Sequence, residues 1–408
     1  CLSMACSYNE NLDVIKYLVE KTNSQNYTNN NMENCFLLSC KTNPNLKIIK
    51  YLLEEKKMDI HCKNKFGENC LLLACKINPN LEIIKYLIQE IDMDENYKNE
   101  LEENCLLLAC KKNPNLETIK YLIEDIKMDT NIINKNKENC LLLACKENTN
   151  IKIIKYLIDE IKMDTKHLNY RKENCLLLAC KKNANLEIVK YLIEEIKMDP
   201  KYINENEENC LLLACKNKNN SEIMRYLIKE QDINTDHFDF EGKNSLLVSC
   251  SNDKYLTNTK YLIEKVKMDI NYTDFEEKNC LLFACFINES DRCFETIKYL
   301  IEEIKIDIKC TDSVGNNCLS LSCNGDNIKT VKYLVETCNM DVNYKNSYNE
   351  NCLLFSCYSN SNNLKVIKYL IEVRNMDPNC KNSKNENCLI LACEHQNLNL
   401  IKYLIEKQ

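Results

Sequence analysis

Apolar residues recur along the chain with spacings that predict pairs of short helices. In residues 68–98, the run ENCLLLACK places Leu71, Ala74 and Cys75 at positions i, i+3 and i+4, which share one face of a helix. Asn69 lies just before the apolar run, and its side chain can accept a hydrogen bond from the free backbone N–H groups that open a helix. We therefore expect a short first helix that is capped by Asn69.

A second helix is expected after residues 78–80, Asn-Pro-Asn, because proline cannot continue a helix and disfavours helical geometry in the residue before it. In the segment LEIIKYLIQEI that follows, Ile84, Leu87, Ile88 and Ile91 hold the positions i, i+3, i+4 and i+7 of a buried face. The polar stretch ENYKNELEE comes next and has neither helical nor strand periodicity. We expect it to form an extended finger loop.

The same unit repeats through the whole sequence. Pairs of cysteines five residues apart recur every 35 residues from Cys35 to Cys280, with Ser245 once in place of the first cysteine. A Lys-Tyr-Leu step, with Arg225 once in place of the lysine, keeps the same register. The tyrosines of this step mark twelve units: Tyr17, Tyr51, Tyr86, Tyr121, Tyr156, Tyr191, Tyr226, Tyr261, Tyr299, Tyr333, Tyr369 and Tyr403.

A pair of short helices cannot bury its apolar face alone, so neighbouring pairs must stack on one another. The sequence therefore predicts an all-α solenoid of about twelve helix-turn-helix repeats with extended finger loops, in one continuous array over residues 1–408. The array is truncated within a repeat at both ends, because the chain begins inside a first helix and stops inside a second one. We expect further chain or capping units to flank it.

The 28 cysteines are interpreted as small buried apolar residues, since 23 of them follow the repeat. Two cysteines five residues apart on a helix point about 140° apart, so one pair cannot hold one metal ion. Equivalent cysteines of stacked helices are expected about 8–10 Å apart, which is too far for a disulfide. This interpretation implies an intracellular, reducing compartment, namely the cytoplasm, the nucleus or a virion.

The repeat resembles the ankyrin repeat, a turn followed by two helices with a period of about 33 residues. The ankyrin unit carries a glycine three residues before the proline of its Thr-Pro-Leu-His motif. Three of the four glycines here keep that place relative to the first helix: Gly67, Gly242 and Gly315. The Thr-Pro and His of the motif are absent, and most units are longer. The resemblance covers the whole chain and implies a divergent ankyrin-type α-solenoid, of the kind found in large DNA viruses and AT-rich protists.

A tetratricopeptide or pentatricopeptide array has a similar period, and the second type binds RNA. Units of these families join through short turns, whereas about ten polar residues separate each second helix from the next unit here. The net charge is -7, from 54 basic and 61 acidic residues, and lacks the basic surplus that drives phosphate binding. Nucleic acid is therefore not expected as a partner. A membrane is not expected either, because no apolar run approaches the roughly 20 residues that span a bilayer.

The sequence offers no constellation for catalysis, a cofactor, a metal or a small-molecule substrate. The four glycines form no cluster of the kind that phosphate-binding loops require. The four histidines lie in distant units, and no nucleophile or carboxylate set converges with them: His61, His167, His237 and His395. Cys62, Cys310 and Cys380 share a finger position with tyrosines such as Tyr97, which indicates a structural role. We predict that the protein is not an enzyme and binds none of these groups.

Two sets of residues are candidates for binding a protein partner. The first is a lysine in the same register at the end of six consecutive first helices: Lys41, Lys76, Lys111, Lys146, Lys181 and Lys216. In an ankyrin array that register borders the concave groove, so the lysines would form a ladder suited to an acidic segment of a partner. The alternative is that each lysine is solvated at the helix C-terminus, where the helix dipole favours a positive charge.

The second candidate set is the finger tips, where large apolar residues stand in polar loops: Phe66, Leu101, Tyr170, Phe240, Phe275 and Tyr348, with Val314 as a smaller member. Exposed aromatic residues are typical anchors of interfaces, and the alternative is packing against the neighbouring finger. The longest turn insertion, within residues 286–297, is a further candidate contact or a neutral surface insertion.

The sequence thus predicts a protein-protein interaction scaffold or adapter that binds its partner along the concave groove and the finger loops. An architectural or assembly component of a larger particle stays open as an alternative, and a pentatricopeptide-like RNA binder as a less favoured one.

Overall fold

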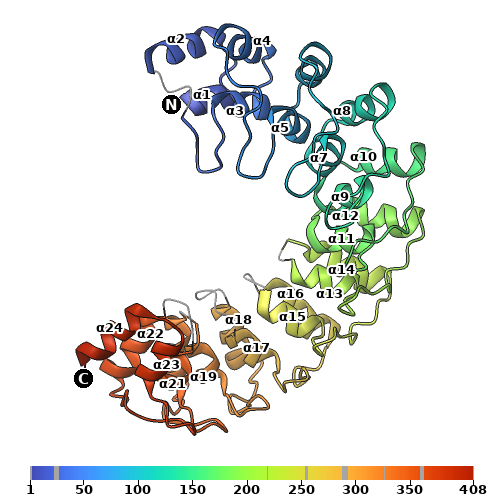
Figure 1. The fold of residues 1–408 in the computed structure, drawn as a ribbon. Helices are drawn as coiled ribbons and strands as arrows, with labels where there is room; N and C mark the ends of the chain where they lie inside the picture. Colours follow the sequence, from blue (N-terminus) through green and yellow to red (C-terminus); the bar gives the residue numbers. More distant parts are fainter. Residues whose placement is uncertain are drawn as a thin grey trace. The chain divides into compact units, whose positions relative to one another are not determined.

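The structure is a computed structural model in which the chain is helical, apart from connecting loops and two isolated β-bridges, Phe238 with Asn244 and Thr311 with Asn317. It describes residues 2–22, 27–217, 219–252, 256–286, 293–325, 327–358 and 363–407. The chain divides into two compact units, Cys1–Glu205 and Asn206–Gln408. The predicted all-α solenoid of helix-turn-helix repeats is confirmed (Figure 1).

The first unit is built from six first helices, each followed by a second helix. The first helices are α1 (Leu2–Tyr8), α3 (Cys35–Thr42), α5 (Cys70–Ile77), α7 (Cys105–Lys112), α9 (Cys140–Glu147) and α11 (Cys175–Lys182). The second helices are α2 (Leu12–Thr22), α4 (Leu46–Lys50), α6 (Leu81–Lys85), α8 (Leu116–Lys120), α10 (Ile151–Lys155) and α12 (Leu186–Lys190). Five of them continue as a wider π-helical turn: η1 (Tyr51–Glu55), η2 (Tyr86–Glu90), η3 (Tyr121–Asp125), η4 (Tyr156–Glu160) and η5 (Tyr191–Glu195).

The second unit repeats this arrangement. Its first helices are α13 (Cys210–Lys216), α15 (Ser245–Asn252), α17 (Cys280–Phe286), α19 (Cys318–Cys323), α21 (Cys352–Ser356) and α23 (Cys388–Glu394). Its second helices are α14 (Ser221–Glu230), α16 (Thr257–Tyr261), α18 (Phe294–Lys298), α20 (Ile328–Lys332), α22 (Leu364–Lys368) and α24 (Leu398–Lys407). Four of these continue as π-helical turns: η6 (Leu262–Val266), η7 (Tyr299–Glu303), η8 (Tyr333–Thr337) and η9 (Tyr369–Val373).

The first helix begins where the sequence predicts. The Asn69 side chain accepts a hydrogen bond from the Leu72 N–H group at 2.9 Å, so the predicted cap is confirmed. The sequence predicted that one face of this helix is buried, but every side chain from Cys70 to Cys75 is inaccessible to solvent. The physical reason is that α5 packs against the first helices on both sides, α3 and α7, and also against its own second helix α6.

The second helix differs in detail from its predicted face. Ile84, Leu87 and Ile88 are buried as predicted, but Ile91 is only half-buried because it follows the last turn of the helix. The prediction missed Ile83 and the ring of the tyrosine that follows Lys85, both of which are buried. A second helix lies between the second helices of its neighbours, so its buried face is wider than one stripe.

Buried asparagines in the turn between the two helices tie each repeat to the one before it. The Asn78 Nδ2 atom donates to the carbonyl oxygens of Cys40 and Asn43 at 2.8 and 2.9 Å, and Asn113 makes the equivalent bonds to Cys75 and Asn78. These bonds satisfy carbonyl groups at the end of a buried helix, which would otherwise lack partners. The repeats are therefore joined by polar bonds as well as by apolar packing.

Buried thiols also meet between neighbouring repeats. The last cysteine of one first helix contacts the first cysteine of the next, for example Cys40 with Cys70 and Cys110 with Cys140. Burial raises the pKa of the Cys40 and Cys110 thiols well above the usual value, so both are held as neutral SH groups. The interpretation of the repeated cysteines as small buried residues is confirmed for these helices, although the sequence did not reveal the contact between non-equivalent positions.

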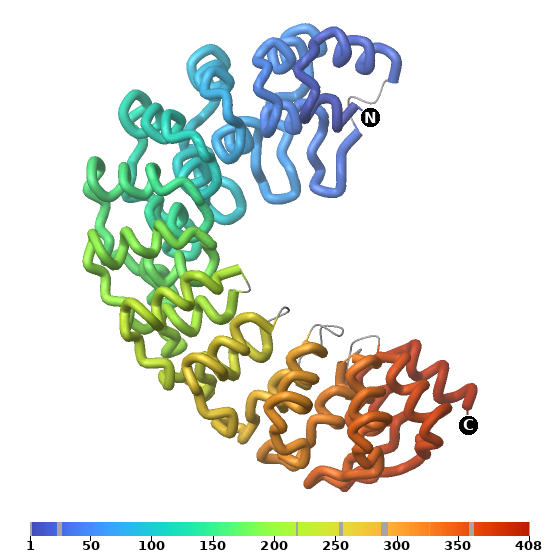
Figure 2. The backbone as a smooth tube through the Cα atoms, turned by 180° about the vertical axis from the view of Figure 1, so that it is seen from behind, coloured from blue at the N-terminus to red at the C-terminus, as the bar shows by residue number. Residues whose placement is uncertain are grey.

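The finger loops project away from the second helices, as the tube view of the first unit shows (Figure 2). Each finger is closed by an asparagine or aspartate that acts as a local template: Asn64 Oδ1 accepts from the N–H groups of Phe66 and Glu68 at 2.9 and 3.0 Å. Gly67 has a φ of +74°, which a glycine adopts without strain. No helix among the described residues is long and apolar enough to cross a membrane.

Candidate functional site

Neighbouring fingers are linked through their backbones just where the apolar tips stand. The N–H group of Glu100 donates to the carbonyl oxygen of Phe66 at 3.2 Å, and the N–H group of Lys135 donates to that of Leu101 at 3.0 Å. The second unit has the same type of bond from Phe275 to Glu241. Within each unit the tips are therefore held at a fixed spacing, although they lie on loops.

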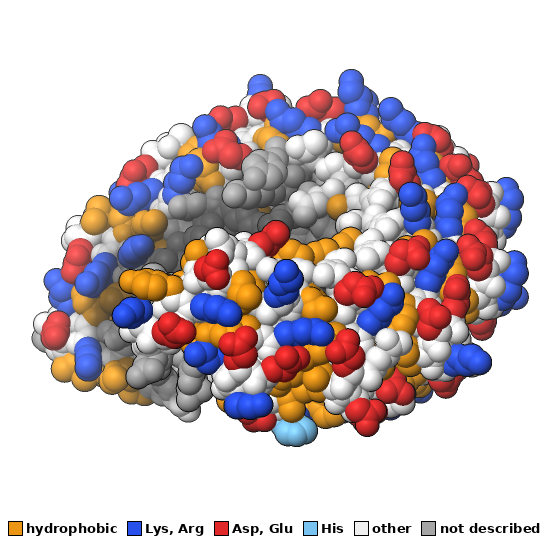
Figure 3. Space-filling model, turned by 90° about the horizontal axis from the view of Figure 1, so that it is seen from above, with side chains coloured by type: hydrophobic (Ala, Val, Ile, Leu, Met, Phe, Trp, Pro, Cys, Tyr) orange, Lys and Arg blue, Asp and Glu red, His pale blue; other side chains and the backbone are white. Residues whose placement is uncertain are grey.

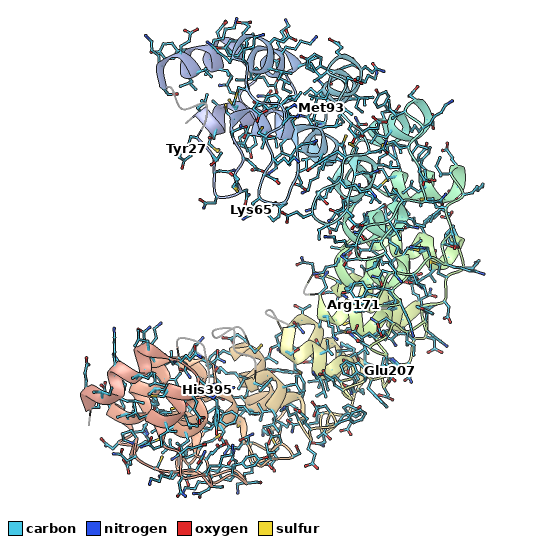
Figure 4. The ribbon with its side chains drawn as sticks, in the orientation of Figure 1. Tyr27, Lys65, Met93, Arg171, Glu207 and His395 are labelled. Carbon is cyan, nitrogen blue, oxygen red and sulfur yellow. The ribbon has the colours of Figure 1, made fainter. Side chains whose placement is uncertain are left out.

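The tip side chains are about half exposed. The exposed fractions are 48% for Phe66, 46% for Leu101, 49% for Tyr170, 54% for Phe240, 68% for Phe275 and 54% for Tyr348. Lys65, the neighbour of Phe66, lies at the free end of its finger in Figure 4, with Arg171 at the tip region of a later finger of the same unit. The six tip side chains are among the exposed apolar side chains of the fingers, which also include Ile133, Ile203 and Phe238, and whether a partner binds the tips stays a prediction.

A second finger position holds the fingers together and is not part of the exposed tip. Tyr97 donates its hydroxyl to the carbonyl oxygen of Gly67 at 2.9 Å, and His167 places Nε2 at 2.8 Å from the carbonyl oxygen of Lys137. His237 does the same with Glu207 at 2.7 Å. Two of the four histidines thus serve as finger-to-finger hydrogen-bonding groups, which fits the structural role expected for this position.

Each of the six lysines at the ends of first helices forms an ion pair within the chain, which the sequence analysis did not predict. Each ammonium group contacts the Oε1 atom of a glutamate eight residues earlier, at the base of the finger. The Nζ to Oε1 distances are 2.7 Å for Lys41 with Glu33, 2.6 Å for Lys76 with Glu68, 2.8 Å for Lys111 with Glu103, 2.7 Å for Lys146 with Glu138 and 2.6 Å for Lys181 with Glu173; Lys216 contacts Glu208 in the same way. The lysine charges are therefore compensated within the chain.

These ion pairs are partly buried. The Glu138 side chain is 3% exposed and the Lys146 side chain 21% exposed. Asn134 completes the arrangement, because its Nδ2 atom donates to the other oxygen of Glu138 at 3.0 Å while its Oδ1 atom accepts from the Glu138 N–H group. An asparagine, a glutamate and a lysine thus form a triad that we call the finger-base triad, with members at positions i, i+4 and i+12.

The titration behaviour of the triad reflects this pairing. Burial alone would raise the pKa of Glu33, but hydrogen bonds from Lys41 and Asn29 and the charge of Lys41 outweigh it and lower the pKa. Burial alone would lower the pKa of Lys111, but the charge of Glu103 and its hydrogen bond raise it. Both groups are therefore held in their charged forms at neutral pH.

Two fingers of the second unit change all three positions of the triad together. Where the glutamate is replaced by Lys243 or Lys278, the asparagine becomes Asp239 or Asp274, and the lysine position is Ser251 or Phe286. The ammonium groups of Lys243 and Lys278 pair with Glu241 and Glu276, and the Nζ atom of Lys216 lies 3.5 Å from Oδ2 of Asp239. This exchange was visible in the sequence as three positions that change together.

Charges of both signs are interspersed on the surface that Figure 3 shows, without a broad area of lysine and arginine. Within the described part of the chain, no group of three or more His, Cys, Asp and Glu side chains is placed to hold a metal ion. Residues 287–292 of the insertion at 286–297 lie outside the described residues, so that candidate contact stays a prediction.

The stacked helix pairs place this chain in the class of α-solenoid repeat proteins. Backbone hydrogen bonds join its neighbouring fingers. The family model for ankyrin repeats in three copies matches overlapping segments over most of the chain: residues 2–97, 36–132, 71–169, 106–202, 176–274 and 281–382. The chain belongs to the ankyrin repeat family, and the predicted resemblance is confirmed. Ankyrin repeats are protein-protein interaction modules, so protein partners are indicated. Comparison with curated proteins gives no significant match.

Proposed function

We propose that this protein is an interaction scaffold or adapter whose partner binds along the finger tips. The observation that carries the proposal is the set of half-exposed apolar side chains on fingers whose backbones are bonded to one another, including Phe66, Leu101 and Tyr170 in the first unit. Apolar anchors on a preorganised backbone lose little conformational entropy when a partner covers them, which favours binding.

The six lysines have a smaller part in this proposal. Each ammonium group already neutralises a buried glutamate, so an acidic partner segment would compete with an internal ion pair. We propose that the lysines contribute to binding mainly by holding the finger bases in place. An acidic segment on the partner stays a prediction that the finger tips do not require.

The experiment is capture of binding partners with finger-tip variants of the full chain. Phe66→Ser, Leu101→Ser and Tyr170→Ser combined should reduce partner capture by about tenfold or more, because buried apolar anchors carry most of the binding energy of an interface. The matched control is Tyr17→Ser, which removes a 63% exposed aromatic from a second helix of the same unit. Equal loss for both variants, or no loss for the triple variant, would contradict the proposal.

The architectural alternative has its own test. Sedimentation of the purified chain should show no large assemblies at micromolar concentration if the protein acts as an adapter. Filaments or closed shells that survive the triple finger-tip substitution would support the architectural role instead.

A further inference from the structure

Glu350 is a buried carboxylate whose finger-base triad lacks the lysine. It follows Asn346 by four residues, as the other triad glutamates follow their asparagines, but the position eight residues later is Tyr358. Glu350 is 5% exposed. Its oxygens accept hydrogen bonds from Asn346 Nδ2 at 3.0 Å, from Asn382 Nδ2 at 3.3 Å and from the Tyr358 hydroxyl. All three donors are neutral.

The Tyr358 hydroxyl occupies the place of the missing ammonium group. It donates to Oε1 of Glu350, and Oε1 is also the atom that receives the lysine in the complete triads. No lysine or arginine forms an ion pair with Glu350 within the part of the chain that the structure describes. A carboxylate that is buried away from water and accepts hydrogen bonds only from neutral groups attracts a cation strongly.

Two other fingers of the second unit also lack the lysine, and they differ from Glu350 in their surroundings. Asp312 is paired with Asn316, whose Nδ2 atom donates to it at 3.0 Å, and Asn324 stands in the lysine position. Glu386 also lacks a lysine, since Glu394 follows eight residues later, but it is only partly buried and water can reach it. Among the described residues Glu350 and Asp312 are both buried without an ion pair, but Glu350 lines a cavity and Asp312 does not.

A cavity of about 370 Å³ opens beside Glu350. Its walls include the rings of Tyr348, Phe355 and Tyr358, and its polar lining includes Asn346 and Glu350. The ring centroids of Phe355 and Tyr358 are 6.2 Å apart in an edge-to-face arrangement. The cavity has the size of a small ligand site, with aromatic walls, the buried carboxylate of Glu350 and the exposed Lys384 in its lining.

We propose that this cavity binds a lysine or arginine side chain of a partner polypeptide, with the cationic group on Glu350 and the aliphatic stem among the aromatic rings. The proposal rests on the proposed function as a protein-binding scaffold. The recognition chemistry is the one that the chain already uses within itself, for example between Lys146 and Glu138. Aromatic faces add attraction for a cation, and a long basic side chain can bury its stem while its head stays polar.

Besides Glu350 and the two tyrosines, a lysine, a glutamate and a histidine lie at or near the cavity. Lys384 lines it, is exposed and forms no ion pair among the described residues, so it is a competing cation at the rim. Glu386 lies on the far side of Asn382, which donates to it at 2.8 Å. His395, labelled in Figure 4, follows α23 and packs edge-on against Tyr358 with ring centroids 5.4 Å apart. Removal of Lys384 should leave the site free for an external cation.

The test uses the full chain and four blocked pentapeptides, Ac-Gly-Gly-X-Gly-Gly-amide, with X as lysine, arginine, norleucine or acetyl-lysine. Binding is followed by saturation-transfer NMR of the side chain of X. Lysine and arginine peptides should bind at least about tenfold more tightly than the norleucine and acetyl-lysine peptides, because a charge-assisted hydrogen bond is lost with the charge. Equal binding of all four peptides would show a merely apolar cavity and overturn the proposal.

Four variants separate the site from general attraction to an acidic protein. Glu350→Gln removes the charge, and Tyr358→Lys supplies the missing cation from within, so both should abolish the preference for lysine. Glu295→Gln, at a 65% exposed acid of the same unit, should keep it. Lys384→Gln should bind the lysine peptide at least as tightly as the natural chain. Binding that survives Glu350→Gln and Tyr358→Lys, or that is lost with Glu295→Gln, would overturn the proposal.

The two proposals fail separately. If the peptides do not discriminate but the finger-tip variants lose their captured partner, the cavity proposal is wrong and the scaffold function stands. If the peptides discriminate but finger-tip variants keep their partner, the cavity binds cations and the finger tips are not the contact surface.

Discussion

The finger bases of the first unit all carry the same triad, whereas those of the second unit vary it. From Asn29 to Lys181 the first unit repeats asparagine, glutamate and lysine without exception, and each ammonium group lies within 2.8 Å of its carboxylate. In the second unit the cation stays at Lys216, moves to Lys243 and Lys278, and is then absent. The comparison teaches that the buried charges change as a set, because one charge left alone in this position is costly.

The largest expected effect comes from breaking a complete triad. Lys146→Met should lower the free energy of unfolding by about 2–3 kcal/mol, because it leaves the Glu138 carboxylate buried without its cation. Urea denaturation followed by circular dichroism measures the change. The double variant Lys146→Met with Glu138→Gln should recover most of the loss, and a double variant no more stable than the single one would contradict the account.

A smaller effect is expected from breaking the exchanged form of the triad. Lys243→Glu should cost about 1–2 kcal/mol, because it removes the cation that pairs with Glu241 and adds a carboxylate near the buried Asp239, where Lys216 at 3.5 Å remains the nearby cation. Adding Asp239→Asn and Ser251→Lys rebuilds the first-unit triad and should restore stability in the same denaturation assay. If the triple variant stays as unstable as Lys243→Glu, the three positions do not form a set.

The pH dependence of stability should differ between the finger bases of the first unit and those of the second unit. The pKa of Glu33 is lowered because Lys41 and Asn29 outweigh burial, so its contribution to stability is present above about pH 4.3, the unfolded value, and is lost as the pH falls through its folded pKa. Burial raises the pKa of Asp274 in the second unit, so the charged form of that group opposes folding and its protonation on acidification costs no stability. Carbon-13 NMR titration should find Glu33 below the ordinary glutamate pKa and Asp274 above the ordinary aspartate pKa, and a shift of either group in the other direction would contradict the comparison.

Loss of a tyrosine hydroxyl from a second helix should have the smallest effect on stability, and the effect should be equal in both units. Tyr156 donates its hydroxyl to Glu124 at 2.7 Å in the first unit, and Tyr333 donates to Glu302 at 2.9 Å in the second. Tyr156→Phe and Tyr333→Phe should each cost about 0.5–1 kcal/mol, because a partly exposed hydrogen bond is exchanged for one with water. Urea midpoints check this, and unequal losses would show that the units differ beyond their finger bases.

The sequence predicted the features that depend on local periodicity. The cap at Asn69 and the break after the first helix follow from properties of single residues and their neighbours. The wider buried face of the second helix was not predicted, because it depends on neighbours 35 residues away. Ile83 is buried for that reason although it lies off the predicted stripe.

The finger-base triads were missed for a related reason. The lysines were recognised as a register, but Glu138 lies in a polar loop before the helix, and a spacing of eight residues matches no periodic element. Burial of a charged loop residue becomes visible only when the finger is folded over the helix end. The joint change at Asp239, Lys243 and Ser251 was the available signal.

The most direct test of the central claim, that Glu350 is a triad carboxylate deprived of its cation, is the stability of Tyr358→Lys. The account predicts a higher urea midpoint for this variant than for the natural chain, since the new ammonium group can reach Oε1 of Glu350 as Lys146 reaches Glu138. The gain should vanish in a chain that also carries Glu350→Gln. A midpoint that falls, or one that rises equally with and without Glu350, would contradict the account.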